Sequence, residues 1–201
     1  MLFRSAYKEN LKKLRDIPKA LKEILEKIPK NAHPMDVMRT ACSALGTLEQ
    51  ESLDRNIKGT QLIGDRLISC FPGILIYWYH FSHSGKRISL ETNQDSIAGH
   101  FLELLHGKSP TALQIKAMNC SLVLYAEHEF NASTFTARVI AGTLSDLYSC
   151  ITGAIGALRG PKHGGANEAA MEIISRYKSA DDAEKDIMKR IGNKEIGRAH
   201  V

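Results

Sequence analysis

The sequence lacks any apolar run of the roughly 20 residues that a membrane-spanning helix requires. Its longest apolar segment, Cys70–Phe81, is shorter and is interrupted by Pro72 and Gly73. The amino-terminal segment also lacks the continuous apolar stretch of a secretory signal, because lysines are scattered through it. We therefore expect a protein with no membrane partner, located in the cytoplasm.

Cysteine is scarce, and the cysteines are never close to one another in the sequence. The four residues are Cys42, Cys70, Cys120 and Cys150, and no C-x-x-C pair occurs. A zinc knuckle or a redox dithiol is disfavoured by this spacing. Free cysteine behaves as a small apolar core residue. The sequence therefore predicts buried free thiols in a reducing compartment.

An excess of acidic residues is also absent, and the formal net charge is +5. Residues 1–30 carry nine basic and four acidic side chains, so the rest of the chain is balanced. Leu21, Leu25 and Ile28 follow helical spacing within this segment, which makes the lysines the solvated face of an amphipathic helix. A basic cluster without a known nucleic-acid-recognition motif is only weak support for nucleic-acid binding. We predict no nucleic-acid partner.

Sustained two-residue alternation is absent too, so no β-strand is predicted and the expected fold class is all-α. Pro18 separates two short helices, and Pro34 suits the first turn of a third that Gly46 can end. The next expected helix is Gln61–Ser82, with a kink near Pro72. The polar segment before this helix, Glu51–Gly59, is interpreted as a loop.

Cap residues divide the second half of the chain into shorter helices. Asp95 or Ser96 can cap a helix that Gly107 ends, and Ser109 with Pro110 opens the next one. Two helices are expected between Ser133 and about Arg159, one after Gly165, and a last one that begins at Ser179 with Asp182. We find no internal repeat and no low-complexity linker.

The two ends of the chain are related in an unexpected way. The residues 1–5 can be encoded by DNA whose reverse complement, read in a shifted frame, yields the residues 196–199. Inverted ends of this kind are typical of sequencing-adapter DNA flanking a cut insert. We therefore interpret residues 1–5 and 195–201 as non-native, and residues 6–194 as a natural segment that is truncated at both ends.

A titratable ring stands at a predicted joint between two helices in LYAEHEFNASTF, residues 124–135. His128 lies between Glu127 and Glu129 where an apolar helix should end, and Asn131 begins the next helix. The local pattern makes His128 a candidate functional residue but does not define its role.

A second histidine lies just before a predicted helix, in GAIGALRGPKHGGANEAAMEI, residues 153–173. The positive end of a helix dipole favours a neutral imidazole at His163, which can donate a hydrogen bond to a carbonyl while an enolate forms. Gly164 and Gly165 remove side chains where a ligand has to approach closely. The alternative is a histidine that only satisfies backbone carbonyls.

His80 and His83 lie three residues apart on a predicted helix and could share a metal ion. No further histidine, cysteine or carboxylate stands at a matching offset, so a core or interface role is favoured and no metal is predicted. The aromatic residues around them cover too much of the helix circumference for one binding stripe. Core or subunit contact is the better interpretation of Tyr77, Trp78, Tyr79 and Phe81.

Four motifs together resemble the citrate synthase family, and most closely its bacterial 2-methylcitrate synthase branch. They are HPMDVMRT (33–40), YWYHFSHSGKRI (77–88), LYAEHEFNASTFTARVIAGT (124–143) and GALRGPKHGGANE (156–168). The branch is suggested by Glu127 before His128 and by Arg159-Gly-Pro-Lys162 before His163. The resemblance extends over essentially the whole of residues 7–194.

The resemblance implies a role for each candidate residue. His163 corresponds to the catalytic histidine that holds the thioester carbonyl of the acyl-CoA and stabilises its enol or enolate. His128 corresponds to a histidine that hydrogen-bonds oxaloacetate, and Asn131 lies in the same turn. The implied reaction condenses propionyl-CoA with oxaloacetate and water to give 2-methylcitrate and CoA, with no cofactor. A citrate synthase that uses acetyl-CoA remains the alternative within the family.

The resemblance also implies an incomplete large domain that runs into the start of a small domain. A Gly-Phe-Gly-His segment, a catalytic aspartate and carboxylate-binding arginines are expected after Lys194, so residues 1–201 alone are expected to be inactive. The intact enzyme is expected to be a homodimer formed through Gln61–Ser82 and Ser109–Glu127. The alternative of another class is a non-catalytic helical oligomerisation module or basic binding module.

Overall fold

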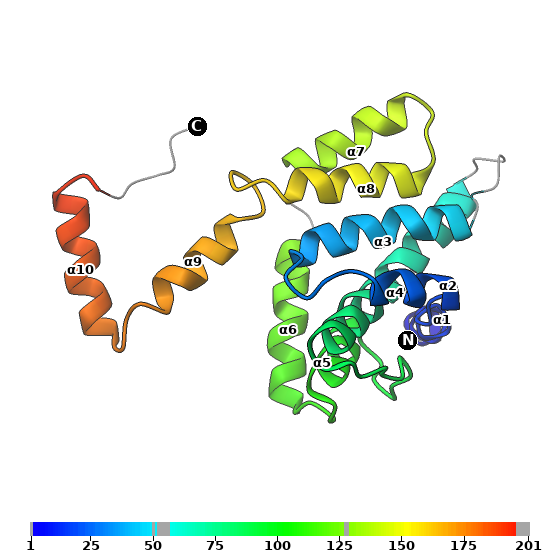
Figure 1. Cartoon of the computed structure of the whole chain (residues 1–201), viewed down its shortest axis with the longest axis horizontal. Helices are drawn as coiled ribbons and strands as arrows, with labels where there is room; N and C mark the ends of the chain where they lie inside the picture. Colours follow the sequence, from blue (N-terminus) through cyan, green and yellow to red (C-terminus); the bar gives the residue numbers. More distant parts are fainter. Residues whose placement is uncertain (1, 50, 52–56, 127–128, 196–201) are drawn as a thin grey trace. The chain divides into compact units, whose positions relative to one another are not determined.

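The chain, described by a computed structural model over residues 2–49, 51, 57–126 and 129–195, forms ten helices within these residues (Figure 1). They are α1 (Leu2–Lys13), α2 (Lys19–Glu26), α3 (Pro34–Leu48), α4 (Ile57–Ser84), α5 (Ile97–His106), α6 (Ala112–Tyr125), α7 (Ala132–Gly142), α8 (Leu147–Leu158), α9 (Ala166–Ile174) and α10 (Ala180–Gly192). No β-strand occurs among the described residues, and the all-α prediction is confirmed. The chain divides into two compact units, Met1–Gly156 and Ala157–Val201.

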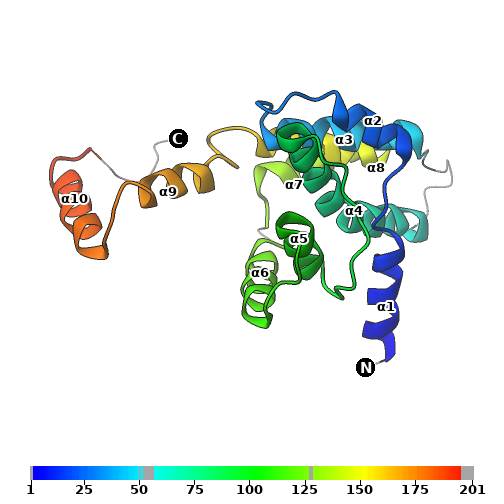
Figure 2. The same cartoon turned by 60° about the horizontal axis from the view of Figure 1, so that its bottom comes forward.

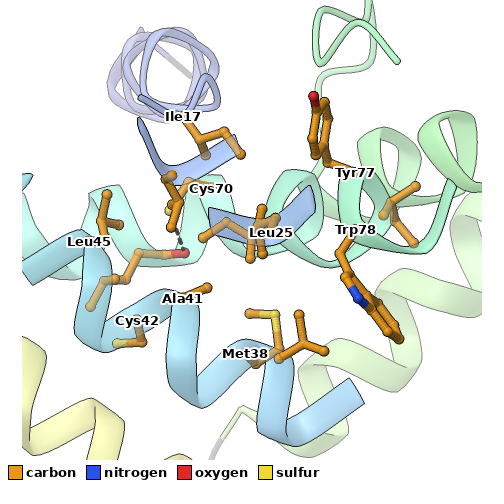
Figure 3. Packing of buried hydrophobic residues seen from close by; sticks show 14 of the residues in the cluster. Ile17, Leu25, Met38, Ala41, Cys42, Leu45, Cys70, Tyr77 and Trp78 are labelled. Atoms are coloured by element: carbon orange, nitrogen blue, oxygen red, sulfur yellow. Dashed lines mark hydrogen bonds between the residues drawn. The ribbon is translucent and has the colours of Figure 1, made fainter. Parts of the chain in front are cut away.

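The core of the first unit lies between α2, α3 and α4. Leu21 and Leu25 on α2 are fully buried and lie one turn apart, so they form one apolar stripe. On α3, Val37, Ala41 and Leu45 repeat the same four-residue spacing and are also fully buried. Figure 3 shows these two faces meeting α4, from which Cys70, Tyr77 and Trp78 point into the core.

Helices α5 and α8 contribute buried residues to this core, whereas the described residues of α6 and α7 include none. In both views α6 lies beside α5, which in turn contacts α4 (Figures 1 and 2). Helices α7 and α8 meet at Gly153, where a Cβ atom would lie 2.2 Å from Cδ1 of Ile140. Tyr148 at the start of α8 is buried in the main core.

The predicted helix caps are confirmed at several positions. Ser96 Oγ accepts a hydrogen bond from the Gly99 amide at 3.0 Å, and Gly107 ends the same helix with a left-handed φ of 65°. Ser179 Oγ accepts from the Asp182 amide at 3.2 Å at the start of α10. Pro18 precedes α2 and Pro34 lies in the first turn of α3, as expected.

Three predicted helix boundaries are wrong. Helix α3 continues through Gly46 to Leu48, because Gly46 provides space for Tyr148, whose Cβ would be 2.6 Å from a Cβ at this position. Helix α4 begins at Ile57 instead of Gln61, so the predicted loop is too long. Thr111, and not Ser109, caps α6, because its side chain and that of Gln114 form a capping box. Pro72 lies inside α4, which continues through it.

The connecting segment 85–96 has no regular secondary structure but is tightly held against the helices. Arg87 binds both carboxylate oxygens of Glu26 at 2.7 and 2.8 Å, and Tyr77 donates to the same carboxylate at 2.7 Å. The bonds from Arg87 and Tyr77 lower the pKa of Glu26 to about 2. Leu90, in the middle of the segment, is buried in the core. This anchoring fixes the position of the polar residues that follow Leu90.

Three of the four cysteines are buried free thiols, as predicted. Cys42, Cys70 and Cys150 are buried, and burial raises the pKa of Cys70 to about 12. Cys120 on α6 is exposed, so the prediction is wrong for this residue. The reason is that α6 contributes no buried residue to the core of the first unit.

The second unit contains α9 and α10, which follow the end of α8. Tyr177, between the two helices, donates a hydrogen bond to Asp186 Oδ2 at 2.5 Å. The apolar residues Ile173, Ile174 and Ile187 line a shallow hollow between the two helices. None of the described α10 residues is buried.

Candidate active site

The turn that carries His163 is wound around a single carbonyl oxygen. The amides of His163, Gly164 and Gly165 all donate to Gly160 O, at 3.0, 3.1 and 3.4 Å. This arrangement connects the end of α8 to the start of α9 at Ala166. Because successive amides share one acceptor, the backbone of His163 has a defined position. Its side chain is half-buried.

Gly164 is required by a close backbone approach in this turn. A Cβ atom on Gly164 would lie 1.8 Å from the carbonyl oxygen of Leu158, a distance no side chain can occupy. A Cβ atom on Gly165 would lie 3.0 Å from Cα of Pro161. The paired glycines therefore allow the chain to fold back on the end of α8. The atoms nearest to both glycines are protein backbone atoms. The predicted reason for the glycines, the close approach of a ligand, stays a prediction.

His163 lies three residues before the first residue of α9, so its predicted place ahead of a helix start is confirmed. Gly165 is the N-cap and provides no side-chain hydrogen bond, which leaves the first amides of the helix without a cap from that residue. The structure therefore fixes the backbone of His163 in the turn that leads into α9.

The second predicted site lies where α6 ends and α7 begins. Glu129 has a left-handed φ of 51°, which turns the chain sharply between the two helices. Asn131 is the N-cap of α7, and its Oδ1 accepts a hydrogen bond from the Thr134 amide at 2.8 Å. This cap uses the oxygen as an acceptor, and the NH₂ group of Asn131 is the part that can donate a hydrogen bond to a substrate oxygen. His128 lies outside the described residues, and its expected hydrogen bond to oxaloacetate stays a prediction.

His80 and His83 each lie within hydrogen-bond distance of a backbone carbonyl oxygen. His80 Nε2 donates to the carbonyl oxygen of Leu104 at 3.0 Å, near the end of α5. His83 is exposed and its Nδ1 lies 3.0 Å from the carbonyl oxygen of Tyr79. Over the described ranges, no group of three or more histidine, cysteine or carboxylate side chains is arranged to hold a metal ion. His80 is half-buried and lies outside the buried core, so the predicted core role is not confirmed for either histidine, and the interface role stays a prediction.

His100 on α5 is a fully buried titratable group that the sequence did not indicate. Its side chain is fully buried, and its Nδ1 forms a hydrogen bond with Thr92 Oγ1 at 3.0 Å. Burial, together with the nearby charge of Arg15, lowers the pKa of His100 to about 4. No local sequence pattern brings His100 and Arg15 together, because the two residues are 85 positions apart in the chain.

The described helices include none that is long and apolar enough to cross a membrane. Solved structures share the helical arrangement. Citrate synthase from Thermoplasma acidophilum matches with a TM-score of 0.81 and 31% identity, covering 94% of this chain and 49% of that one. Citrate synthase from Thermotoga maritima matches with a TM-score of 0.73 and 33% identity, covering 94% and 49%. The fold is therefore that of a helical citrate synthase domain.

Sequence comparisons define the family. The pattern of the citrate synthase C-terminal domain matches residues 4–199. The 2-methylcitrate synthase of Shewanella oneidensis is 60% identical over 98% of this chain and 52% of its own length. The citrate synthase of Heyndrickxia coagulans is 41% identical over 93% of this chain and 50% of its own length. The chain belongs to the citrate synthase family and spans about half the length of these relatives.

Proposed function

We propose that the chain is part of a 2-methylcitrate synthase, an acyltransferase that joins propionyl-CoA, oxaloacetate and water into 2-methylcitrate and CoA. The observation that carries the proposal is the 60% identity to the relative of that name over almost the entire chain. The turn at His163 supports it, since a backbone-fixed histidine before a helix start suits the stabilisation of an enolate.

The proposed reaction begins at the thioester. A base removes a proton from the α-carbon of propionyl-CoA while His163 donates a hydrogen bond to the thioester oxygen, where negative charge develops. The α-carbon then forms a bond to the ketone carbon of oxaloacetate, and the ketone oxygen takes up a proton to become a hydroxyl. Water finally cleaves the thioester, which releases CoA and the new carboxylate. We assign the base to an aspartate in the part of the enzyme that follows Lys194.

Oxaloacetate is assigned to the joint between α6 and α7. We propose that His128 hydrogen-bonds this substrate and that Asn131 assists through its NH₂ group, which can donate to the carboxylate or ketone oxygens of oxaloacetate. The citrate synthase of Thermoplasma acidophilum, which shares the fold, was solved with carboxymethyl coenzyme A and oxaloacetate. Acyl-CoA is a substrate in this scheme, and we propose no cofactor. We place the enzyme in the cytoplasm, with no nucleic-acid or membrane partner.

A homodimer is proposed from the exposure of α6 and α4. Leu113, Val123 and Leu124 on α6 are 74%, 74% and 75% exposed, and Leu62 on α4 is 61% exposed. Exposed apolar side chains of this size are typical of an interaction surface. We propose a second copy of the same chain as the partner, which would bury this surface in the intact enzyme.

The alternative substrate is acetyl-CoA, because one methylene group typically contributes only about 1–3 kcal/mol to discrimination. The test uses a full-length chimera in which residues 6–194 replace the matching segment of the Shewanella oneidensis relative. Thiol release with oxaloacetate is measured as kcat/KM for propionyl-CoA and for acetyl-CoA. We expect a preference for propionyl-CoA, and a clear preference for acetyl-CoA would overturn the substrate assignment.

The role of His163 is tested in the same chimera. We expect His163→Ala to lower kcat by roughly 10²–10³-fold, the typical cost of losing one oxyanion donor. A folded His163→Ala chimera that retained full kcat would contradict the proposed role. A chimera that folds but has no activity, and instead binds duplex DNA in a salt-dependent way, would favour a basic binding module.

A further inference from the structure

Arg15, in the connection between α1 and α2, is a buried cation with neutral partners. Its side chain is 5% exposed. Nη1 donates to the carbonyl oxygen of Gln94 at 2.8 Å and to Thr92 Oγ1 at 3.4 Å. Both bonds involve Nη1, and no described residue provides an acceptor for Nε or Nη2. This free Nε–Nη2 edge is the part of a guanidinium that binds two oxygens of an anion side by side.

The carboxylates nearest to Arg15 are already engaged elsewhere. Glu9 and Asp95 bind Lys12, at 3.1 and 2.6 Å. A charge that is buried without an ionic partner is costly, and buried charges in proteins are normally paired. Two neutral acceptors on Nη1 explain how Arg15 holds segment 85–96, but they do not neutralise its charge. The local charge balance therefore favours an additional anion.

Arg15 lines a cavity between the end of α1 and segment 85–96. Its volume is about 270 Å³, enough for a phosphate or a small carboxylate. Lys12 and Lys13 line it together with Arg15, and Asp16 and Glu91 are the acidic residues in its wall. Lys13 and Glu91 are exposed, so both can be changed without disturbing the core.

The acidic residues do not cancel this attraction. Asp16 forms an ion pair with Lys22 at 3.0 Å, so part of its charge is already balanced. Glu91 is exposed to solvent at the edge of the cavity, where its repulsion of an anion is weakened by water. Glu91 is therefore the residue whose neutralisation should strengthen anion binding.

The backbone around Arg15 is fixed in place before any ligand binds. Arg66 Nη1 donates to the carbonyl oxygens of Leu14 and Asp16, the two neighbours of Arg15, at 2.5 Å each. Arg66 is in turn bound by Glu49 at 2.6 Å. A binding group held on a rigid backbone loses little entropy when its ligand binds. The cavity is thus lined by a positioned charge whose Nε and Nη2 have no acceptor among the described residues.

We propose that this cavity is a binding site for a small oxyanion, a phosphate or carboxylate group, held by the Nε–Nη2 edge of Arg15 and attracted by Lys13. The proposal concerns a site distinct from the turns of His128 and His163 and does not depend on the condensation activity. The ligand would bridge the α1–α2 connection and segment 85–96.

The test follows the Nε–Hε resonance of Arg15 in the ¹⁵N-labelled 201-residue chain, assigned by its loss in Arg15→Lys. Inorganic phosphate and malonate are titrated separately at constant ionic strength, so that the two arms distinguish phosphate from carboxylate. We expect a saturable shift with at least one of them. Arg15→Lys retains the charge but removes the donor edge, so we expect it to weaken anion binding about tenfold or more. Binding to this variant is measured from the shifts of backbone amide resonances.

Surface variants keep the proposal testable even where changing Arg15 disturbs folding. Lys13→Gln should weaken binding about threefold and Glu91→Gln should strengthen it by a similar factor, since exposed charges interact weakly. The matched control is Lys30→Gln, which removes the same charge from an exposed residue that does not line the cavity. Shifts that never saturate, or an equal effect of Lys13→Gln and Lys30→Gln, would overturn the proposal.

Discussion

Arg66 and Glu49 join α4 to the end of α3 through a two-pronged ion pair. Arg66 Nε lies 2.9 Å from one carboxylate oxygen of Glu49, and Nη2 lies 2.6 Å from the other. The two side chains are only 14% and 30% exposed. Since Arg66 also binds the connection between α1 and α2, a single guanidinium holds three parts of the first unit together.

Replacing Arg66 with alanine should therefore destabilise the chain. We expect the free energy of unfolding of the 201-residue protein to fall by about 3 kcal/mol, because the carboxylate and two backbone carbonyls lose their donor. Urea denaturation followed by circular dichroism measures this change. Lys30→Ala, at an exposed position, serves as the control and should change stability by less than ~0.5 kcal/mol. A loss below ~1 kcal/mol for Arg66→Ala would show that water replaces its bonds.

Gly164→Ala should disrupt the turn that positions His163. The added Cβ would lie 1.8 Å from the carbonyl oxygen of Leu158, so the backbone has to move. A displacement near 1 Å at a catalytic group can cost about 10²-fold in rate, and we expect kcat of the chimera to fall by at least that factor. The matched control is Gly192→Ala in α10, where no atom lies within 4 Å of the new Cβ. Equal activity of the two variants would refute the positioning argument.

The sequence was sufficient for features that depend on nearby residues. The caps at Ser96, Asn131 and Ser179 were predictable because each side chain bonds an amide three residues ahead. The place of His163 before a helix was predictable for the same reason, since glycine and proline define the break between α8 and α9. The roles predicted for His128 and Asn131 rest on the family resemblance and stay predictions.

Features that depend on distant contacts were not predictable. The sequence predicts a helix end at Gly46, but in the structure the missing side chain of Gly46 leaves room for Tyr148, which lies 102 positions later. Arg15 reads as one of many basic residues on a solvated face, and only its contacts with Thr92 and Gln94 show that it is buried. His100 reads as an ordinary helix residue. In each case a tertiary neighbour, and not the local pattern, determines the role.

The exposed apolar residues of α6 should mediate dimer formation in the full-length chimera. Val123 is 74% exposed, and a charge at this position would be desolvated in a subunit contact. We expect the chimera to sediment as a dimer at micromolar concentration and Val123→Asp to shift it toward the monomer. Lys185→Asp on α10, another exposed position, should leave the dimer intact. A monomeric unmodified chimera would count decisively against the proposed homodimer.

The stability of the chain should fall in mild acid because of His100. Its pKa is lowered from 6.5 to about 4 in the folded protein, so the unfolded chain binds a proton more readily between these values. The free energy of unfolding therefore decreases as the pH falls through this window, by ~2 kcal/mol between pH 7 and pH 5. The pKa of Glu26 is lowered from 4.5 to about 2, so this carboxylate reduces the free energy of unfolding mainly when the pH falls below 4.5. The two groups thus act in largely separate pH ranges.

Urea denaturation at pH 7 and pH 5 tests this assignment. His100→Gln removes the titrating ring, and we expect the difference in unfolding free energy between the two pH values to shrink by most of that ~2 kcal/mol. His83→Gln removes an exposed ring from the end of α4 and should leave the difference unchanged. Thr92 and Arg15 face His100, and their own groups stay in one protonation state across this range. An unchanged pH dependence in His100→Gln would therefore mean that His100 is protonated equally in the folded and unfolded chain, which its complete burial beside a guanidinium argues against.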